Sequence, residues 1–481
     1  MSTQKRLMTN WRWWICSLLF IATTVNYLDR QVLSLTYKEF IAPEFHWTDA
    51  HYGTITGFFS IFYAVACLFA GKFVDWLGTK KGYLIAIGVW SLGAVMHAGC
   101  GVATTWFVDE ISSVEALRAI EAGSNVALAV STVSVYLFLL CRGILALGEA
   151  GNFPAAIKAT AEYFPKKDRA FATSIFNAGA SVGALAAPLL IPPLAKKLGW
   201  EMAFIVIGGM GFVWMFFWQM MYDKPDKSKH VNGEELSYIR QDDQDAAAPA
   251  AQEEKAIPML KCFKYKQTWS FAIGKFLTDG VWWFFLFWAP AFFQDQFNAP
   301  ASSPLGQGLI FTLYAIVTVI SLFGGYLPKY FVEKKGMHPY TGRMRAMLIF
   351  AFFPLVALAA QPLGSFSPWW PAILIGIAAA GHQAWSANIF STVGDMFPRS
   401  TVASITGIGA MAGGMGSFII NKGSGALFTY AEKAGENFAF LGFTGKPAGY
   451  FIVFCFCGLA YLIAWGVMKS LVPRYKPVEV R

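Results

Sequence analysis

The stretch GKFVDWLGTKKG (residues 71–82) recurs as GYLPKYFVEKKG (residues 325–336), with the same glycine start and the same Lys-Lys-Gly end. A second correspondence joins the Phe-Pro pair at 164–165 to the Phe-Pro pair at 397–398. Corresponding residues are 254 positions apart in the first case (325 minus 71) and 233 in the second (397 minus 164). A repeat of this kind indicates a chain built from two similar halves.

The two offsets differ by 21 residues, so the first half holds about that many extra residues. They fall in the segment 101–131, between the third and fourth apolar runs. We interpret this segment as an insertion on the outer face. It would form a short helix with an amphipathic continuation into the fourth run, and no chemistry is evident in it.

The composition indicates a membrane protein. Only 14% of the 481 residues are charged and 56% are hydrophobic, whereas soluble proteins average roughly 25% charged residues. A bilayer-crossing helix needs roughly 20 apolar residues, and about twelve runs approach that length: 13–36, 52–74, 82–101, 134–163, 169–195, 202–222, 269–294, 306–328, 344–361, 369–397, 401–428 and 447–469. The first run is too long and too charged for a cleaved signal peptide.

We therefore predict an all-α integral membrane fold of twelve transmembrane helices in two pseudo-symmetric six-helix bundles. The N-terminal bundle covers 1–222, a linker with one short helix at GEELSYI covers 223–268, and the C-terminal bundle covers 269–481. Two six-helix halves are typical of secondary transporters, whose substrate site lies near the midplane between the repeats.

Lysine and arginine in short loops set the orientation. They cluster before the first run, after the second, fourth and eighth, and at the C-terminal end, whereas the alternate loops are richer in acids. Both termini are therefore expected in the cytoplasm, in a monomer embedded in the cell (inner) membrane. The net charge of +9 reflects this topology, so we expect no nucleic-acid partner.

Charges inside apolar runs are costly and usually functional. Arg142 and Glu149 lie seven residues apart in the fourth run, on nearly the same helix face and roughly 10 Å apart along the axis. The guanidinium fits a carboxylate, and a carboxyl group away from water gains a proton more readily. The pair is interpreted as an anion clamp with a proton carrier, and the alternative is a structural salt bridge. Arg30 would add a second cation.

The second half is polar rather than charged. An offset of 233 places His382 opposite Glu149, as a second proton site or as a neutral hydrogen-bonded histidine. Around His382 lie side chains suited to sugar hydroxyls and rings, and the fifth run adds a further amide: Gln383, Trp385, Asn388 and Asn177. Lys275 and Asp279, one helical turn apart, are interpreted as an internal ion pair or inner gate, with direct substrate binding as the alternative.

The segment 71–82 also resembles the cytoplasmic signature of the major facilitator superfamily. That resemblance gives Asp75 and the basic cluster with Lys80 the role of a conformational latch. The family usually has arginine after the aspartate, where this chain has Trp76.

Within that superfamily, NYLDR (26–30), RGILALGEAGNFPA (142–155) and GHQAWSANIFSTVGDMFP (381–398) resemble the anion:cation symporter family, and most closely its hexuronate transporters. The resemblance implies proton-coupled import of a sugar acid such as galacturonate or glucuronate. It places substrate contacts at Tyr27, Arg30, Tyr63 and Arg142, and proton coupling at Asp29 and Glu149. No cofactor, metal site or catalytic residue is expected.

Three alternatives stay open at this point. Another organic anion, such as galactonate or glucarate, would fit the same residues. A membrane enzyme would need a reactive constellation, and the six histidines form no HExxH motif. A membrane sensor on a transporter scaffold would need an output domain, for which the short linker leaves no room.

Overall fold

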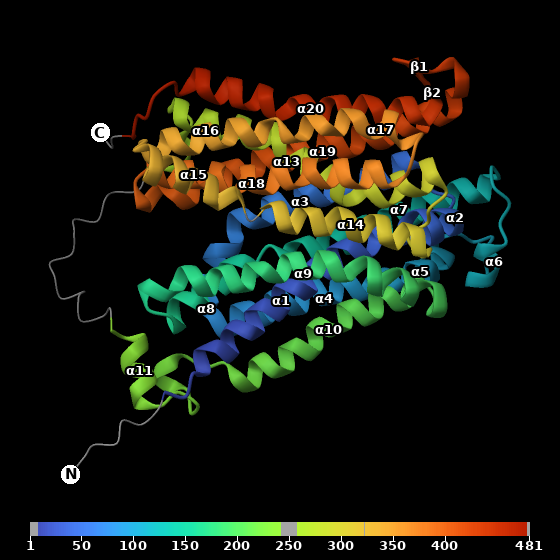
Figure 1. Ribbon diagram of the computed structural model, residues 1–481. Coiled ribbons are helices and arrows are strands. Elements are labelled where there is room, and N and C mark those ends of the chain that lie inside the picture. Colours follow the sequence, from blue (N-terminus) through green and yellow to red (C-terminus); the bar gives the residue numbers. More distant parts are fainter. Residues whose placement is uncertain (1–7, 242–256, 322, 479–481) are drawn as a thin grey trace, which may run out of the picture.

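The computed structural model describes residues 8–241, 257–321 and 323–478, and its regular elements are helices apart from one small hairpin (Figure 1). The long elements are α1 (Trp11–Thr36), α3 (Asp49–Leu77), α4 (Thr79–Ala98), α7 (Asn125–Glu149), α8 (Asn152–Tyr163), α9 (Lys166–Leu198), α10 (Trp200–Met221), α13 (Lys266–Phe297), α14 (Pro304–Ser321), α15 (Phe323–Lys335), α16 (Pro339–Ala351), α18 (Trp369–Met396), α19 (Arg399–Ala434) and α20 (Gly445–Leu471). The short elements are η1 (Tyr37–Ile41), α2 (Ala42–Phe45), α5 (Cys100–Phe107), α6 (Val114–Arg118), η2 (Pro225–Lys227), α11 (Gly233–Ile239), α12 (Met259–Cys262), η4 (Phe353–Ala359), α17 (Ala360–Gly364), η5 (Gly435–Asn437), β1 (Ala439–Phe440) and β2 (Phe443–Thr444).

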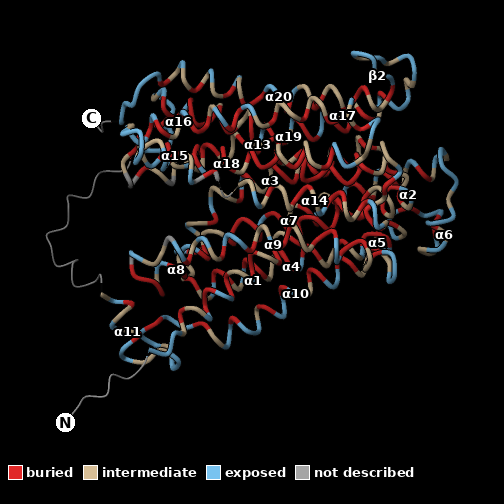
Figure 2. Tube along the Cα trace, viewed as in Figure 1, coloured by how far each residue is buried: buried red, intermediate tan, exposed pale blue. Residues whose placement is uncertain are grey.

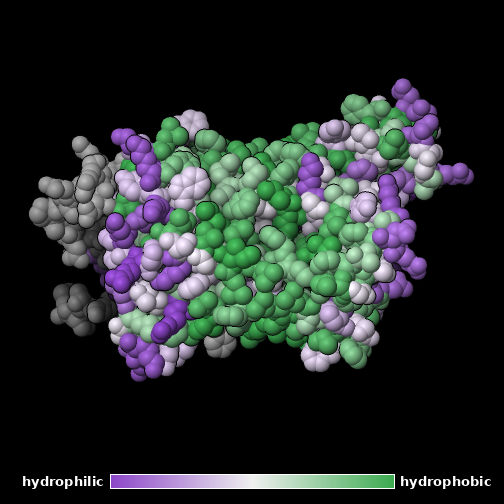
Figure 3. All heavy atoms as spheres, turned by 90° about the horizontal axis from the view of Figure 1, so that it is seen from above, coloured by the Kyte–Doolittle hydropathy of each residue, from purple (hydrophilic) through white to green (hydrophobic). Residues whose placement is uncertain are grey.

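Eight helical rods in the described ranges are long and apolar enough to cross a membrane, and the bent pair α4–α5 makes a ninth. The helices α1, α18 and α19 are 26, 28 and 36 residues long, and with them the described ranges hold twelve long helical rods. On the face shown in Figure 3, a belt of apolar side chains crosses the middle of the molecule, and polar side chains gather at both ends. The predicted all-α membrane fold is confirmed, and the hairpin β1–β2 is an addition that we did not predict.

The helices pack in two groups, α1 to α10 and α13 to α20 (Figure 1), here called the N-half and the C-half. The start of α1, the end of α20 and α11 lie at one end of the molecule, here called the terminal end, and α2 and α6 lie at the opposite, distal end (Figure 1). The two halves diverge toward the terminal end. Buried residues are dense where α3 meets α19 (Figure 2). There a Cβ atom at Gly53 would lie 2.6 Å from the Asn421 carbonyl oxygen, so this approach requires glycine.

The fourth rod is broken immediately after Glu149, between α7 and α8. Pro154 lies four residues beyond Ala150, and a proline ring clashes with the carbonyl of the residue four positions earlier in a continuous helix. The break therefore follows from the sequence, and it places Glu149 at the end of α7. The rod begins at Asn125, earlier than the predicted start at 134, because the amphipathic part of the insertion continues the helix.

The insertion folds at the distal end as α5 and α6. The Arg118 guanidinium at the end of α6 pairs with Glu44 (3.0 Å) and with Glu201 (2.6 Å). Both partners belong to the N-half, so these ion pairs fix the insertion to that half.

The linker helix α11 coincides with the predicted GEELSYI segment and docks on the start of α1. The fully buried Glu235 carboxylate accepts hydrogen bonds from the Trp11 amide (2.9 Å), the Arg12 amide (3.1 Å) and the Arg12 guanidinium (3.0 Å). A carboxylate at a helix N-terminus satisfies free N–H groups and complements the helix dipole. The Tyr238 hydroxyl donates to Asp168 of α9 (2.7 Å), so α11 joins two rods of the N-half.

We expect Glu235→Gln to lower the free energy of unfolding by about 3 kcal/mol, because it leaves the buried Arg12 guanidinium without its counter-charge. Thermal unfolding of the purified protein in detergent measures the change. Glu234→Gln, on the exposed side of the same helix, is the matched control. Equal unfolding midpoints for the two variants would contradict the assigned role.

Candidate functional site

The centre of the N-half holds a buried ion pair between Arg30 of α1 and Glu149 of α7. The Arg30 Nε and Nη2 atoms donate to Glu149 Oε2 at 2.9 and 2.7 Å. Arg30 is 3% exposed and Glu149 is fully buried. Two opposite charges at this depth compensate each other, and removal of one would leave the other unpaired at a high free-energy cost.

Three aromatic rings surround the Arg30 guanidinium. Its central carbon lies 5.1 Å from the ring centroid of Tyr27, 4.9 Å from that of Tyr63 and 5.0 Å from that of Trp283. Cation–π contacts of this kind stabilise a desolvated arginine. Trp283 belongs to α13 of the C-half, whereas Tyr27 and Tyr63 belong to the N-half. Aromatic rings from both halves therefore contact the Arg30 guanidinium. The structure thus places the predicted Tyr27, Arg30 and Tyr63 together.

Arg142 does not pair with Glu149, and the interpretation of these two residues as a structural salt bridge is wrong for this conformation. No carboxylate of the described chain lies within ion-pair distance of Arg142, and its Nη1 atom has no hydrogen-bond partner there. Its guanidinium lies over the Phe59 ring at 5.3 Å. The reason is geometric: the two residues are two turns apart on α7, so Arg30 reaches the carboxylate from a neighbouring helix.

Asp29 is 1% exposed, and the buried Trp90 indole is the polar group beside its carboxylate, although the two do not form a hydrogen bond of normal geometry. Asn26, one turn earlier on α1, is fully buried, and its side-chain amide has no hydrogen-bond partner among the described residues. Burying an ionised carboxylate without a partner is costly. Asp29 and Arg30 are adjacent in sequence, but only Arg30 belongs to the ion pair with Glu149.

A cavity of about 400 Å³ lies between the two halves. Its wall combines amides, hydroxyls and aromatic rings from both halves, including Tyr27, Asn177 and Ser181 from the N-half and Trp282, Tyr314, Gln383 and Ser386 from the C-half. Tyr27 lines the cavity and also stacks on Arg30, so one side chain connects the cavity to the buried ion pair. The predicted Asn177 and Gln383 lie here together.

His382 and Trp385 lie behind the cavity wall. The His382 Nδ1 atom and the Tyr461 hydroxyl are hydrogen-bonded at 2.7 Å, and the imidazole stacks on Trp282, which lines the cavity. The Trp385 indole is fully buried and packs edge-on against Tyr461. Trp385 therefore packs inside the C-half and does not line the cavity in this conformation.

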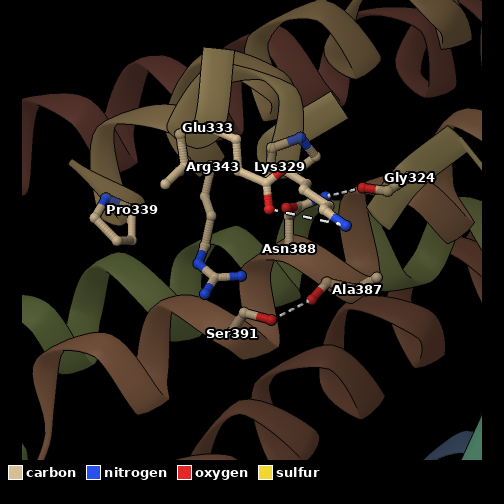
Figure 4. A pocket seen from close by; sticks show the side chains of 10 residues that line it. Gly324, Lys329, Glu333, Pro339, Arg343, Ala387, Asn388 and Ser391 are labelled. Atoms are coloured by element: carbon tan, nitrogen blue, oxygen red, sulfur yellow. Dashed lines mark hydrogen bonds and ion pairs between the residues drawn. The ribbon is translucent and has the colours of Figure 1, made fainter. Parts of the chain in front are cut away.

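Asn388 lines a different cavity, of about 380 Å³, between α15, α16 and α18 (Figure 4). Its amide donates to the Gly324 carbonyl (2.9 Å) and to the Ala384 carbonyl (2.8 Å). Lys329 and Glu333 of α15 line the same cavity, and their charged groups are 3.8 Å apart. The structure thus separates Asn388 from Gln383, although the two are close in sequence.

Lys275 and Asp279 form an ion pair of 2.7 Å within α13. The Lys275 ammonium lies 4.2 Å from the ring centroid of Phe390, which lines the cavity between the halves. Gly413 of α19 makes room for the pair, because a Cβ atom there would lie 2.2 Å from the Asp279 carboxylate. The predicted ion pair is therefore present, and the Phe390 ring lies between Lys275 and the cavity.

The predicted latch residues lie at the terminal end and pair inside the N-half. Asp75 pairs with Lys158 of α8 (2.7 Å), and Lys80 pairs with Asp223 (2.9 Å). In this conformation these two ion pairs do not join the halves.

The sequence analysis missed Trp282, Trp283 and Tyr314. Aromatic residues in an apolar run resemble ordinary packing residues. The only available signal was the density of tryptophan in the seventh run, where two of them are adjacent.

The model of the Major Facilitator Superfamily matches residues 19–420. The hexuronate transporter of Escherichia coli (strain K12) is 28% identical over 419 residues, which cover 86% of this chain and 87% of the relative. The galacturonate transporter of Dickeya chrysanthemi is 27% identical over 369 residues, covering 77% and 95%. These relatives confirm the family resemblance noted in the sequence.

The crystal structure of a bacterial homolog of the human lysosomal transporter Spinster superposes with a TM-score of 0.67 at 18% identity, covering 97% of this chain and 99% of that one. That likeness concerns the fold alone. The family match spans most of the chain, which establishes a transporter rather than an enzyme. The protein is therefore a multi-pass membrane transporter that belongs to the Major Facilitator Superfamily.

Proposed function

We propose that the protein is a proton-coupled symporter that imports a sugar acid, and that this sugar acid is a hexuronate such as galacturonate or glucuronate. The observation that carries the proposal is the buried Arg30–Glu149 pair behind the wall of a cavity with amide and hydroxyl groups. Two relatives that cover most of the chain are named for hexuronate and galacturonate transport. The alternative is another anion of this kind, such as galactonate or glucarate.

The ion pair supplies a mechanism for coupling. While Glu149 is ionised, it occupies the Arg30 guanidinium, and a carboxylate substrate would have to compete for that cation. A proton on Glu149 removes this competition and leaves Arg30 to pair with the substrate. Proton binding and anion binding then favour each other, and this linkage is reciprocal. Asp29, buried without an ion-pair partner among the described residues, is a second position where a bound proton lowers the free energy of burial.

Arg142 is the cation that needs no displacement. It is buried and has no carboxylate partner within the described part of the chain, and its guanidinium presents a fork that matches a carboxylate. The amides of Asn177 and Gln383 suit sugar hydroxyls, and the rings of Tyr27 and Trp282 offer apolar faces to the sugar ring. The carboxylate of the substrate would then face the N-half, whereas its hydroxyls would face amides from both halves.

Both termini are proposed to lie in the cytoplasm, because the loops at the terminal end carry the excess of lysine and arginine. The distal end would then face outward, and the protein would lie in the inner membrane as a monomer. In that orientation, an inward proton gradient drives the sugar acid into the cell by alternating access.

Glu149→Gln should lower gradient-driven galacturonate uptake into proteoliposomes at least 10-fold and leave counterflow exchange intact, because a neutral side chain at 149 frees Arg30 but cannot carry a proton. Glu333→Gln, at an exposed ion pair of α15, is the control and should transport normally. Unchanged gradient-driven uptake by Glu149→Gln would refute the coupling role.

Arg142→Ala should weaken galacturonate binding at least 100-fold, since a buried charge-assisted pair contributes about 3 kcal/mol. Isothermal titration of the purified protein measures the dissociation constant. The control is Arg345→Ala, which removes an exposed guanidinium. Retained affinity in Arg142→Ala would exclude this residue as the anion clamp.

A ligand panel separates the two substrate classes. We expect galacturonate and glucuronate to raise the unfolding midpoint of the purified protein by several degrees, because a ligand that binds only the folded state stabilises it. Galactonate and glucarate should give smaller shifts at equal concentration. Larger shifts with galactonate or glucarate would assign the protein to the alternative substrates.

A further inference from the structure

At the distal end, two lysines and two aspartates form a closed ring of four ion pairs. Lys38 (η1) lies 3.1 Å from Asp49 (α3) and 3.2 Å from Asp295 (α13). Lys446 (α20) lies 2.5 Å from Asp49 and 2.8 Å from Asp295. Each charge therefore touches two charges of the opposite sign. We call these four residues the four-charge ring.

The ring is divided evenly between the halves. The N-half contributes Lys38 and Asp49, and the C-half contributes Lys446 and Asp295. Each half also contributes a tyrosine to its own aspartate: Tyr37 donates to Asp49 at 2.6 Å, and Tyr450 donates to Asp295 at 2.9 Å. Two ion pairs thus lie within halves, and the other two cross between halves.

The ring is shielded from water, which strengthens its ion pairs. The side chain of Asp49 is fully buried, and those of Asp295 and Lys446 are 11% and 10% exposed. Opposite charges attract more strongly away from water, and desolvated charges are stable only when paired. Other polar contacts lie nearby: Glu432 is 3.6 Å from Lys446, and Glu39 of η1 accepts hydrogen bonds from Ser302 of the C-half.

We propose that the four-charge ring is the outer gate of the transporter. In the conformation described it holds the halves together at the distal end, and it opens by parting along the boundary between them. Each half then keeps a lysine, an aspartate and a tyrosine that still pair with one another. Opening breaks two ion pairs and leaves no charge unpaired, so the gate can open and close repeatedly. This inference rests on the proposed alternating access.

The division of the ring allows a selective test. The double substitution Lys446→Asp with Asp295→Lys preserves the ion pair within the C-half but sets like charges against each other across the boundary. We expect the distal end to open. Amide hydrogen exchange of the full chain in lipid nanodiscs, without substrate, should become at least 5-fold faster in segments 37–56 and 287–303. Segments 149–164 and 383–398, on the terminal side, should become more protected.

The matching substitutions in the N-half, Lys38→Asp with Asp49→Lys, added to the first pair, restore attraction across the boundary and should return exchange to the wild-type pattern. Arg118→Gln is the control, because its ion pairs lie at the same end but within the N-half. It should leave segments 37–56 and 287–303 within 2-fold of wild type. If the double variant folds poorly, the single substitution Asp295→Asn replaces it. This variant should also speed exchange at the distal end, to a smaller extent.

Three results would overturn the proposal: wild-type exchange in the double variant and in Asp295→Asn, faster distal exchange without added protection on the terminal side, or no recovery in the fourfold variant. Because no substrate is present, these results do not depend on which anion is transported. If the ligand panel identified no sugar acid, the substrate assignment would fail while the gate could still stand on the exchange data.

Discussion

An ionised side chain inside a membrane-spanning bundle is costly unless its charge is compensated, and the arrangement around Arg30 provides that compensation. Its guanidinium is compensated by one carboxylate, Glu149, and by three aromatic rings. Because Tyr63 comes from α3, Glu149 from α7 and Trp283 from α13, the surroundings of this one cation on α1 depend on four helices and both halves. Any change that moves α1 relative to α13 also changes the surroundings of the charge.

Two features of the backbone beside the Arg30–Glu149 ion pair position the Glu149 side chain. Pro154 ends the continuous run of the fourth rod just after Glu149, so the carboxylate occupies a helix end rather than a helix middle. Gly148, the residue before it, packs directly on α4, where a Cβ atom would lie 2.3 Å from the Trp90 amide nitrogen. The glutamate is therefore held between a tight helix contact and a break, which fixes the direction in which it reaches Arg30.

The number and approximate extent of the rods could be predicted from the sequence because apolar length and an internal repeat are enough to define them. The charged residues of the centre could also be predicted, since few charges occur inside apolar runs. Their partners could not, because pairing depends on how the helices are rotated and how close they lie. Gln383 and Trp385 illustrate this: two residues apart on a helix, they point about 200° apart, so Gln383 faces the cavity while Trp385 packs against Tyr461. Asp49 likewise resembled an ordinary loop acid until the fold brought it beside Lys446.

The two halves have similar backbones, but they carry different side chains at the proposed substrate site. At the centre the N-half supplies Arg30, Arg142 and Glu149, whereas amides, hydroxyls and aromatic rings line the cavity from both halves. At the distal end each half supplies one lysine, one aspartate and one tyrosine. An asymmetric centre can read the two unlike ends of a substrate, one charged and one hydroxylated. A balanced ring suits a boundary that must separate and close again, because each half remains electrically neutral there on its own. The two repeats thus differ where we propose that the substrate binds, and they match where we propose that the halves separate.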